Sequence, residues 1–347
     1  MLDIDQSEIF MRAALAEAKK GLGQTSPNPA VGAVLVASGK ILARGHHRRA
    51  GSRHAEIECL AQLHGAVPKN AELYVTLEPC STAGRTPPCT EAIVAAGIKR
   101  VVIGATDPNP RHAGRGITEL EKAGVQVRAG VLSENCATMN ESFNKWIQTR
   151  QPFVIAKCGM SLDGRLTRGP NESRWLTSAA ARRHAHTLRA QVDAILIGAE
   201  TLRRDDPRLT IRSAKTTRQP WRIVLTRSGK LPREAILFKD RYADRTLVYT
   251  NESLAGVLKN LGEKQITSVL IEGGGQILSE ALDGRLIDKV QIYLAPLFTG
   301  GPVLAFAGKG AGASNEALHL SRMRYEEVDG SVCVSGYPLE TIGAARE

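Results

Sequence analysis

The residues with the clearest chemical potential are His54, Glu56, Cys80 and Cys89. One histidine and two cysteines can provide three ligands for Zn²⁺, and a site with three protein ligands keeps its fourth tetrahedral position open for water. Glu56 lies two residues after His54 and is not needed as a ligand. A carboxylate beside such a water can accept its proton and pass it to a departing amine. The pattern therefore predicts one zinc ion per chain and hydrolytic deamination.

The spacing of the two cysteines differs from the usual signature of zinc nucleobase deaminases. That signature is His-x-Glu followed by Pro-Cys-x-x-Cys, whereas here eight residues separate Cys80 from Cys89. The longer spacing needs a loop that returns to the metal, and Gly84, Pro87 and Pro88 suit such a loop. Each residue alone has an ordinary structural interpretation, because cysteine is often a small core residue. The combination favours the metal site over that alternative.

The elements expected around these residues alternate between strand and helix, which predicts a layered α/β unit over residues 1–150. In the helix that follows the histidine ligand, Ile57, Leu60 and Ala61 are expected to face the core. The histidine and the second cysteine each precede a helix, whose positive N-terminal end favours thiolate and hydroxide. We expect strands at 31–36, 40–43, 72–77, 100–104 and 125–128, and helices at 5–20, 55–63, 90–96, 117–123 and 136–146.

A second unit, residues 151–347, is expected to begin at the Arg150-Gln151-Pro152 boundary. A new apolar strand starts there, and no metal-ligand pattern recurs after it. The alternation of strands and helices again predicts an α/β fold. We expect strands at 153–159, 194–198, 222–226, 246–250, 268–272 and 289–294, and helices at 178–190, 252–261 and 276–282.

Two stretches of the second unit follow apolar strands directly and are candidates for ligand binding. Gly273-Gly274-Gly275 lies between a strand and a helix, where bare amides and the helix dipole can hold a phosphate. The same run has an alternative interpretation as a tight turn. Thr201 and Asp205 follow another strand, and ligands of α/β sheets bind at the C-terminal ends of strands. Trp175, just before a helix, is either a ligand contact or a core residue.

Composition narrows the functional classes. The chain has 347 residues, and 46 Lys and Arg against 35 Asp and Glu give a net charge of +11. This balance suits nucleic acid or small phosphorylated ligands. Aromatic residues make up only 4%, which is too few for base-stacking platforms, so we expect phosphorylated small molecules, with neither nucleic acid nor membrane as a partner.

The predicted setting is cytoplasmic. Six unevenly spaced cysteines argue against a disulfide framework and for a reducing compartment. The acidic start, Met1-Leu2-Asp3-Ile4-Asp5, is unlike a secretion signal. No apolar run reaches the roughly 18 residues that a membrane span needs.

Motifs in both halves resemble those of two enzyme families of riboflavin biosynthesis. The first half resembles the diaminohydroxyphosphoribosylaminopyrimidine deaminases through Thr25-x-Pro27-Asn28-Pro29-x-Val31-Gly32, Gly45-x-His47-x-x-Ala50-Gly51-x-x-His54-Ala55-Glu56 and Gly84-Arg85-Thr86-Pro87-Pro88-Cys89. The second half resembles the 5-amino-6-(5-phosphoribosylamino)uracil reductases through Lys157-x-x-x-Ser161-Leu162-Asp163-Gly164, Asp205-x-Pro207-x-Leu209 and Glu272-Gly273-Gly274. The resemblance implies a cytidine-deaminase-like layered α/β/α domain followed by a dihydrofolate-reductase-like α/β domain, as in the fused bacterial enzymes.

The resemblance also implies roles for residues at matching positions. It places zinc on His54, Cys80 and Cys89, with Glu56 as the proton shuttle. Thr82 is a departure, because the family usually has histidine there. The implied contacts of NADPH or NADP⁺ are Gly159, Trp175, Thr201, Asp205, Gly274, Gly275, Gln276, Ile277 and Leu278. The implied substrate contacts are Asn28 (alternatively a turn residue), His47, Lys157, Ser173, Arg189, Leu209, Arg212 and Glu272.

Two consecutive reactions are therefore expected. The first is zinc-dependent hydrolytic deamination of 2,5-diamino-6-ribosylamino-4(3H)-pyrimidinone 5′-phosphate. The second is NADPH-dependent reduction of the ribosyl group to give 5-amino-6-ribitylaminouracil 5′-phosphate. A homo-oligomer, dimer or tetramer, is expected. The alternatives are a nucleic-acid-editing deaminase with an RNA-binding C-terminal half, and a binding protein in which zinc is only structural.

Overall fold

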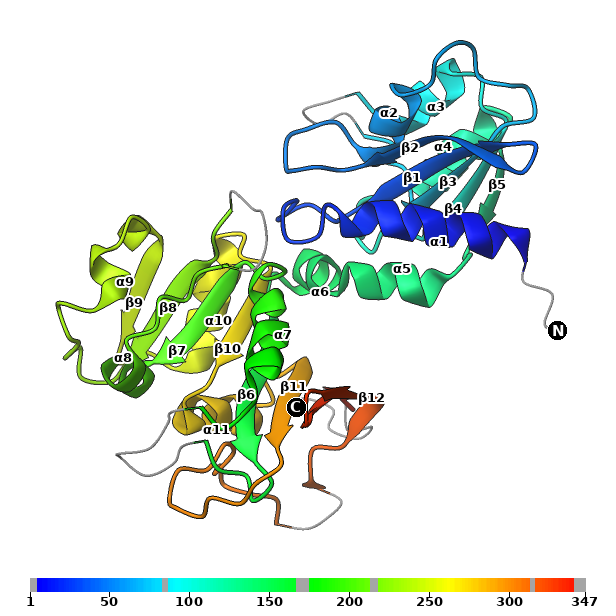
Figure 1. Ribbon diagram of the computed structural model, residues 1–347. Helices are drawn as coiled ribbons and strands as arrows, with labels where there is room; N and C mark the ends of the chain where they lie inside the picture. The colour runs from blue at the N-terminus through cyan, green and yellow to red at the C-terminus, as the bar shows by residue number, and fades with distance from the viewer. Residues whose placement is uncertain (1–4, 83–86, 167–174, 213–217, 313–315, 340–347) are drawn as a thin grey trace. The chain divides into compact units, whose positions relative to one another are not determined.

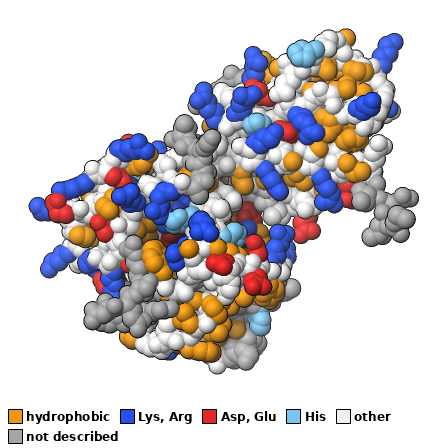
Figure 2. Space-filling model, viewed as in Figure 1, with side chains coloured by type: hydrophobic (Ala, Val, Ile, Leu, Met, Phe, Trp, Pro, Cys, Tyr) orange, Lys and Arg blue, Asp and Glu red, His pale blue; other side chains and the backbone are white. Residues whose placement is uncertain are grey.

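The computed structural model describes residues 5–82, 87–166, 175–212, 218–312 and 316–339. The chain divides into two compact units, Met1–Arg150 and Gln151–Glu347, and Figure 1 shows the helices and strands of each. Lys and Arg side chains are scattered among other residue types over the visible face of each unit (Figure 2). Within the described residues, no helix is both long and apolar enough to cross a membrane.

The first unit is built on a five-stranded sheet with the order β2-β1-β3-β4-β5. The β1 strand pairs antiparallel with β2 and β3, while β3, β4 and β5 run parallel. Every residue of β1 is buried, as expected for an apolar strand inside a covered sheet. The strands are β1 (Gly32–Ala37), β2 (Lys40–His46), β3 (Glu72–Leu77), β4 (Arg100–Ala105) and β5 (Gln126–Ala129).

Helices cover both faces of this sheet, which gives the three-layer arrangement predicted from the sequence (Figure 1). On one face, α1 (Gln6–Lys19) and α5 (Ser133–Met139) pack on the sheet through an apolar cluster that includes Met11 and Cys136. On the other face lie α2 (Ala55–Leu60), α3 (Cys89–Ala95) and α4 (Arg115–Lys122), around a cluster that includes Cys59, Ile93 and Leu120.

Two details of this unit differ from the sequence-based prediction. The expected helix 136–146 is two helices, α5 and α6 (Glu141–Thr149), separated at Asn140. The buried Asn140 side chain accepts the N–H of Ala30 and donates to its carbonyl. These two long-range hydrogen bonds stabilise the break more than a continuous helix would. The predicted inner face of α2 is only partly right. Leu60 packs against the core cluster, but Ala61 is exposed and Glu56 faces inward beside Ala55 and Cys59.

The second unit is built on an eight-stranded sheet with the order β12-β13-β11-β6-β10-β7-β8-β9. The six strands from β11 to β9 in this order are parallel, and β13 and β12 are added antiparallel at one edge. The strands are β6 (Phe153–Ser161), β7 (Ala194–Gly198), β8 (Trp221–Thr226), β9 (Thr246–Thr250), β10 (Ser268–Glu272), β11 (Lys289–Ala295), β12 (Leu320–Val328) and β13 (Ser331–Pro338).

Helices again lie on both faces of the sheet. One core cluster joins α10 (Leu254–Glu263) and α11 (Gly275–Asp283) to the sheet. The other joins α7 (Ala179–Arg189), α8 (Ala199–Asp205) and α9 (Ile236–Lys239) to the opposite face. A short 3₁₀ turn, Ala243–Arg245, precedes β9.

The β12–β13 hairpin and α8 were not predicted from the sequence. The edge strand β12 contains Arg322, Arg324, Glu326 and Glu327, so it lacks the apolar pattern of a covered strand. Its turn does carry a recognisable signal, because the Asp-Gly pair 329–330 has positive φ at both positions and such turns favour a tight hairpin.

Candidate active sites

The three predicted metal ligands converge at one end of the first sheet. His54 is the N-cap residue of α2, and Cys89 is the first residue of α3. Cys80 follows the C-terminal end of β3 by three residues. The loop between the cysteines passes through residues 83–86, which lie outside the described part, and returns Cys89 to the site. All ligand atoms lie within 4.8 Å of one another.

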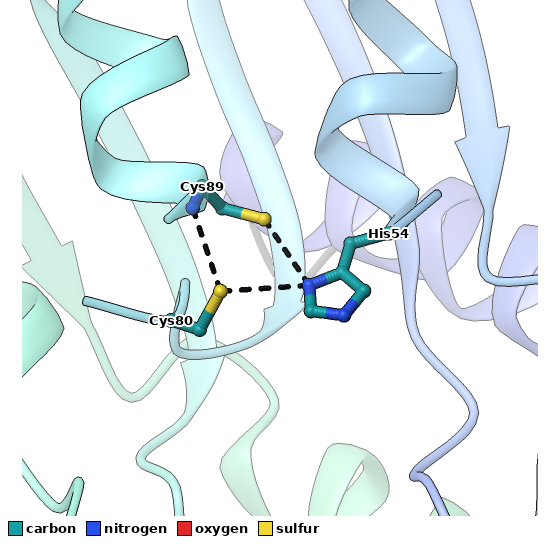
Figure 3. A group of neighbouring side chains, drawn as sticks. All are labelled: His54, Cys80 and Cys89. Carbon is teal, nitrogen blue, oxygen red and sulfur yellow. Dashed lines mark hydrogen bonds between the residues drawn. The ribbon is translucent and has the colours of Figure 1, made fainter. Parts of the chain in front are cut away.

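The donor atoms fit a tetrahedral zinc site. Figure 3 shows both sulfur atoms facing one edge of the His54 ring. The His54 Nδ1 lies 3.3 Å from Cys89 Sγ and 3.5 Å from Cys80 Sγ. Typical Zn–S and Zn–N lengths place tetrahedral S and N ligands about 3.6 Å apart. The separations and the soft, deprotonatable donors therefore agree with zinc ligation.

The surroundings of Cys80 favour its thiolate form. A hydrogen bond from Cys89 is the main cause that lowers the pKa of Cys80, and His54 and the Cys89 N–H add to it. The same hydrogen bond raises the pKa of Cys89. The Cys80 sulfur also raises the pKa of His54. The site is therefore arranged to hold a thiolate at Cys80.

Glu56 is a buried carboxylate beside the metal ligands. Glu56 is only 2% exposed, and its Oε2 atom has no hydrogen-bond partner within the described structure. Burial raises the pKa of Glu56 to about 7. A carboxyl group with this pKa can both accept and release a proton near neutral pH. An unpartnered buried oxygen also indicates that the site receives a further polar group.

His47 and Asn28 form a second layer beside the metal ligands. The Nδ1 atom of His47 lies 3.0 Å from the carbonyl of Arg53, so Nδ1 carries the proton. The Nε2 atom then accepts from the Asn28 amide at 3.2 Å. Burial lowers the pKa of His47, which favours this neutral form. The His47 ring meets the His54 ring edge-on at 5.3 Å between centroids.

The loop after β4 is fixed next to Cys80 by Glu78. This buried carboxylate accepts backbone N–H groups from Asp107 at 3.0 Å, Gly114 at 3.0 Å and Gly116 at 2.8 Å. The loop places His112 Nδ1 3.4 Å from the hydroxyl of Thr82. Position 82 is the one at which the resemblance leads one to expect a histidine. No role for Glu78 was predicted from the sequence, although its position directly before Pro79-Cys80 was a usable signal.

A large cavity occupies the second unit at the C-terminal ends of β6, β7, β8 and β10. Its volume is about 1260 Å³, enough for a dinucleotide together with part of a second ligand. Residues predicted to bind the cofactor or the substrate line it: Lys157, Gly159, Thr201, Asp205, Glu272, Gly274, Gly275, Gln276 and Ile277. The strand ends and the glycine run therefore face one cavity, as the sequence predicted.

Several predicted contacts do not line this cavity. Leu278 is fully buried in the core below α11, and Leu209 is 2% exposed in the core on the opposite face of the sheet. Trp175 is 47% exposed and lies under the guanidinium of Arg182 at 4.8 Å. Ser173 lies outside the described residues. A side-chain contact to the cofactor is therefore not supported for Leu278.

Arg189 is engaged with Glu272. Its Nε and Nη2 atoms donate to the two carboxylate oxygens at 2.6 and 2.7 Å, and Nη1 donates to the Thr210 carbonyl at 3.3 Å. Burial opposes ionisation of Glu272, but the charges of Arg189 and Lys157 outweigh it and lower its pKa to about 2. Arg189 thus holds an ionised carboxylate at the cavity wall. The exposed Arg212 lies 3.5 Å from His186 Nε2 and is the more available cation.

We expect the Arg189–Glu272 pair to make stability depend on acid pH. Glu272 has a pKa of about 2 in the fold and about 4.3 when unfolded, and each unit of difference corresponds to about 1.4 kcal/mol. Between these two pH values the unfolded chain binds more protons than the folded one. The pair therefore contributes roughly 3 kcal/mol to the free energy of unfolding above pH 4.3, and this contribution is lost as the pH falls towards 2. Denaturant unfolding at stepped pH should show a steeper loss for the wild type than for Glu272→Gln. Equal slopes would contradict the assignment.

Comparison with known proteins identifies both units. Residues 4–105 match the cytidine and deoxycytidylate deaminase zinc-binding region, and residues 152–334 match the RibD C-terminal domain. The riboflavin biosynthesis protein RibD of Aquifex aeolicus is 37% identical over 346 residues, which cover 94% of this chain and 96% of its own. The RibD protein of Escherichia coli is 38% identical, covering 85% of this chain and 89% of its own.

Solved structures agree over almost the whole chain. Acinetobacter baumannii RibD is 34% identical with a TM-score of 0.88, covering 96% of this chain and 99% of that one. A diaminohydroxyphosphoribosylaminopyrimidine deaminase/5-amino-6-(5-phosphoribosylamino)uracil reductase from Thermotoga maritima is 35% identical with a TM-score of 0.87 and the same coverage.

The fold and the metal ligands of the first unit define a zinc-binding, cytidine-deaminase-like domain, and the second unit is a reductase domain with a dihydrofolate-reductase-like fold. Two such domains in one chain make a bifunctional enzyme. The chain belongs to the RibD family, the bifunctional pyrimidine deaminases and reductases of riboflavin biosynthesis. The predicted fold class and paired activities are confirmed. The two alternatives are wrong, because the C-terminal half is a reductase domain and the family consists of enzymes.

Proposed function

We propose that the first unit hydrolyses the amine of 2,5-diamino-6-ribosylamino-4(3H)-pyrimidinone 5′-phosphate and that the second reduces the product to 5-amino-6-ribitylaminouracil 5′-phosphate. The substrate named for the Thermotoga maritima relative supports this choice. The observation that carries the deaminase assignment is the buried Glu56 carboxylate, with its unpartnered Oε2, beside three convergent zinc ligands.

In the deaminase unit, His54, Cys80 and Cys89 would hold zinc. When bound, zinc supplies an acidified water as the nucleophile. Glu56 accepts the proton of the attacking water at Oε2 and delivers it to the departing ammonia. Its burial excludes bulk water, which would otherwise compete for the proton. The Asn28–His47 pair presents fixed polar atoms for orienting the pyrimidine, because both hydrogen bonds of the His47 ring define its tautomer.

In the reductase unit, the cavity would hold NADPH and the deaminated substrate together. NADPH supplies the hydride that reduces C1′ of the ribosyl group. The amides that begin α11 would hold the cofactor phosphates, since Gly273 and Gly274 carry no side chain that would block close approach. Lys157 and the ionised Glu272 would face the substrate, with Arg212 available for its phosphate. An ionised carboxylate near C1′ can stabilise positive charge that develops there before hydride arrives.

We also propose a cytoplasmic setting and a homo-oligomeric state. All six cysteines are free, as expected in a reducing compartment. The oligomer stays a prediction, whose measurement is the molar mass in solution.

We expect one zinc ion per chain. Cys89→Ala removes one of three ligands and should reduce bound zinc at least tenfold. Cys136→Ala is the matched control, because Cys136 is equally buried in the same unit but lies in an apolar cluster. Metal analysis of both purified variants measures the effect. Two zinc ions in the wild type, or full zinc in Cys89→Ala, would show that the ligand set is wrong.

A further inference from the structure

A single carboxylate joins the end of β6 to the loop after β11. Asp163 Oδ1 accepts the Ser161 hydroxyl at 2.5 Å and the Thr299 N–H at 3.2 Å, while Oδ2 accepts the Gly300 N–H at 2.8 Å. Ser161 Oγ in turn accepts the Arg165 N–H at 3.0 Å. Asp163 therefore organises its own turn and binds a segment about 136 residues further along the chain.

Backbone hydrogen bonds continue this junction on both sides. Leu162 N–H donates to the Leu297 carbonyl at 2.9 Å, and Leu166 N–H donates to the Val303 carbonyl at 3.0 Å. The return bond runs from Ala305 N–H to the Gly164 carbonyl at 2.9 Å. The turn at 162–166 and the 297–305 loop therefore form one paired structure.

This paired structure forms part of the wall of the large cavity. Leu166, Pro302, Val303 and Leu304 all line it. The loop also packs directly on the start of α11, because a Cβ at Gly275 would lie 2.1 Å from the Leu304 carbonyl oxygen. The position of the 297–305 loop thus sets the space above the amides that begin α11.

Between Leu297 and Val303, the described contacts of the loop other than those with Asp163 are few, and one of them is the Thr299 hydroxyl, which donates to Ser161 Oγ at 3.4 Å. Gly300 and Gly301 both have positive φ, and Phe298 is 77% exposed, so it adds no core anchor. Two backbone N–H groups of this segment donate to the Asp163 carboxylate. Without the Asp163 carboxylate, the loop would therefore lose these two bonds beside Gly300 and Gly301, where the backbone is most flexible.

We propose that Asp163 is a positioning residue for the cofactor: it holds the 297–305 loop against α11 so that the nicotinamide dinucleotide binds in a preformed site. This inference rests on the proposed function of the cavity as the NADPH site. It assigns Asp163 no contact with substrate or with the reacting atoms. A preformed wall spares the cost of ordering the loop when the cofactor binds.

The charge of Asp163 suits this role. The hydrogen bond from the Ser161 hydroxyl is the main cause that lowers the pKa of Asp163 to about 2. Desolvation opposes it, and the N–H groups of Gly300 and Thr299 add to it. The carboxylate thus remains ionised at physiological pH and offers only acceptor sites to the two amides.

The test compares full-length Asp163→Asn with the wild type in NADPH oxidation. In the variant, the NH₂ group of asparagine replaces one carboxylate oxygen and cannot accept the backbone N–H that this oxygen accepts in the wild type. The loop is then held less firmly, so KM for NADPH should rise about tenfold. The kcat at saturating NADPH and the rate of ammonia release should stay within about twofold. Asp244→Asn is the control, because Asp244 is an exposed aspartate of the same unit that does not line the cavity. Trypsin should cut after Lys309 faster in the variant, and NADPH should protect this bond.

An unchanged KM for NADPH in folded Asp163→Asn would overturn the proposal. If that variant does not fold, Ser161→Ala provides the decision, since it removes the hydroxyl that orients the Asp163 carboxylate and that also accepts from the Thr299 hydroxyl of the loop. A KM no higher than that of Asp244→Asn would then overturn it. Failure of the wild type to oxidise NADPH would instead count against the proposed function of the cavity, so the two failures are distinguishable.

Discussion

Replacing Glu56 with glutamine is expected to reduce ammonia release about 10³-fold, within the range of general acid–base catalysis. The amide has nearly the same shape but cannot accept the proton of the attacking water. Glu56 is buried and its Oε2 has no partner in the described structure, so the substitution breaks no observed hydrogen bond of that atom. Zinc content and NADPH oxidation with the deaminated substrate should therefore remain unchanged.

Glu58→Gln is the matched control for this variant. Glu58 is on the same helix, two residues further on, and pairs with Arg48 at 3.2 Å near the surface. Its replacement should leave the rate of ammonia release within about twofold, because its partner Arg48 is exposed and an ion pair at the surface contributes little. If Glu56→Gln with full zinc released ammonia at the wild-type rate, another group would have to carry the proton.

Replacing Gly274 with valine is expected to weaken NADPH binding about 100-fold. Gly274 is the N-cap of α11 with φ of 82° and ψ of 96°, a backbone conformation that a β-branched residue adopts only with strain of a few kcal/mol. A Cβ there would also lie 3.3 Å from the Thr201 hydroxyl, inside the cavity. The side chain would therefore occupy space beside the amides expected to approach the cofactor phosphates.

Fluorescence titration with NADPH measures this effect, and ammonia release checks the first unit, which should be unaffected. Gly330→Val is the control for strain alone, since Gly330 has φ of 74° with open space around it, in the β12–β13 turn outside the cavity. If Gly274→Val bound NADPH as tightly as the wild type, the glycine run would be only a turn and the phosphates would bind elsewhere.

The sequence alone determined which residues carry chemistry and which elements precede them. His54, Cys80 and Cys89 could be selected because few residue types bind zinc. Glu56 could be selected because a carboxylate beside them is not needed as a ligand and can carry a proton. The apolar strands and the glycine run were readable because their periodicity and flanking residues are local features. The order of elements followed from the same local signals and predicted both α/β units.

The tertiary structure decided how these residues are used. Arg189 and Glu272 are 83 positions apart, and only the fold brings them together as a buried pair. Leu278 faces the core because successive side chains of a helix point about 100° apart. A match to a sequence motif does not show which of these side chains faces the cavity. Asn140 breaks a predicted helix for a bond to Ala30, 110 residues away. Asp163 likewise acquires its role from a distant loop. Sequence patterns encode local conformation and side-chain chemistry, whereas contacts between distant segments depend on strand order and packing, which are set only when the whole chain folds.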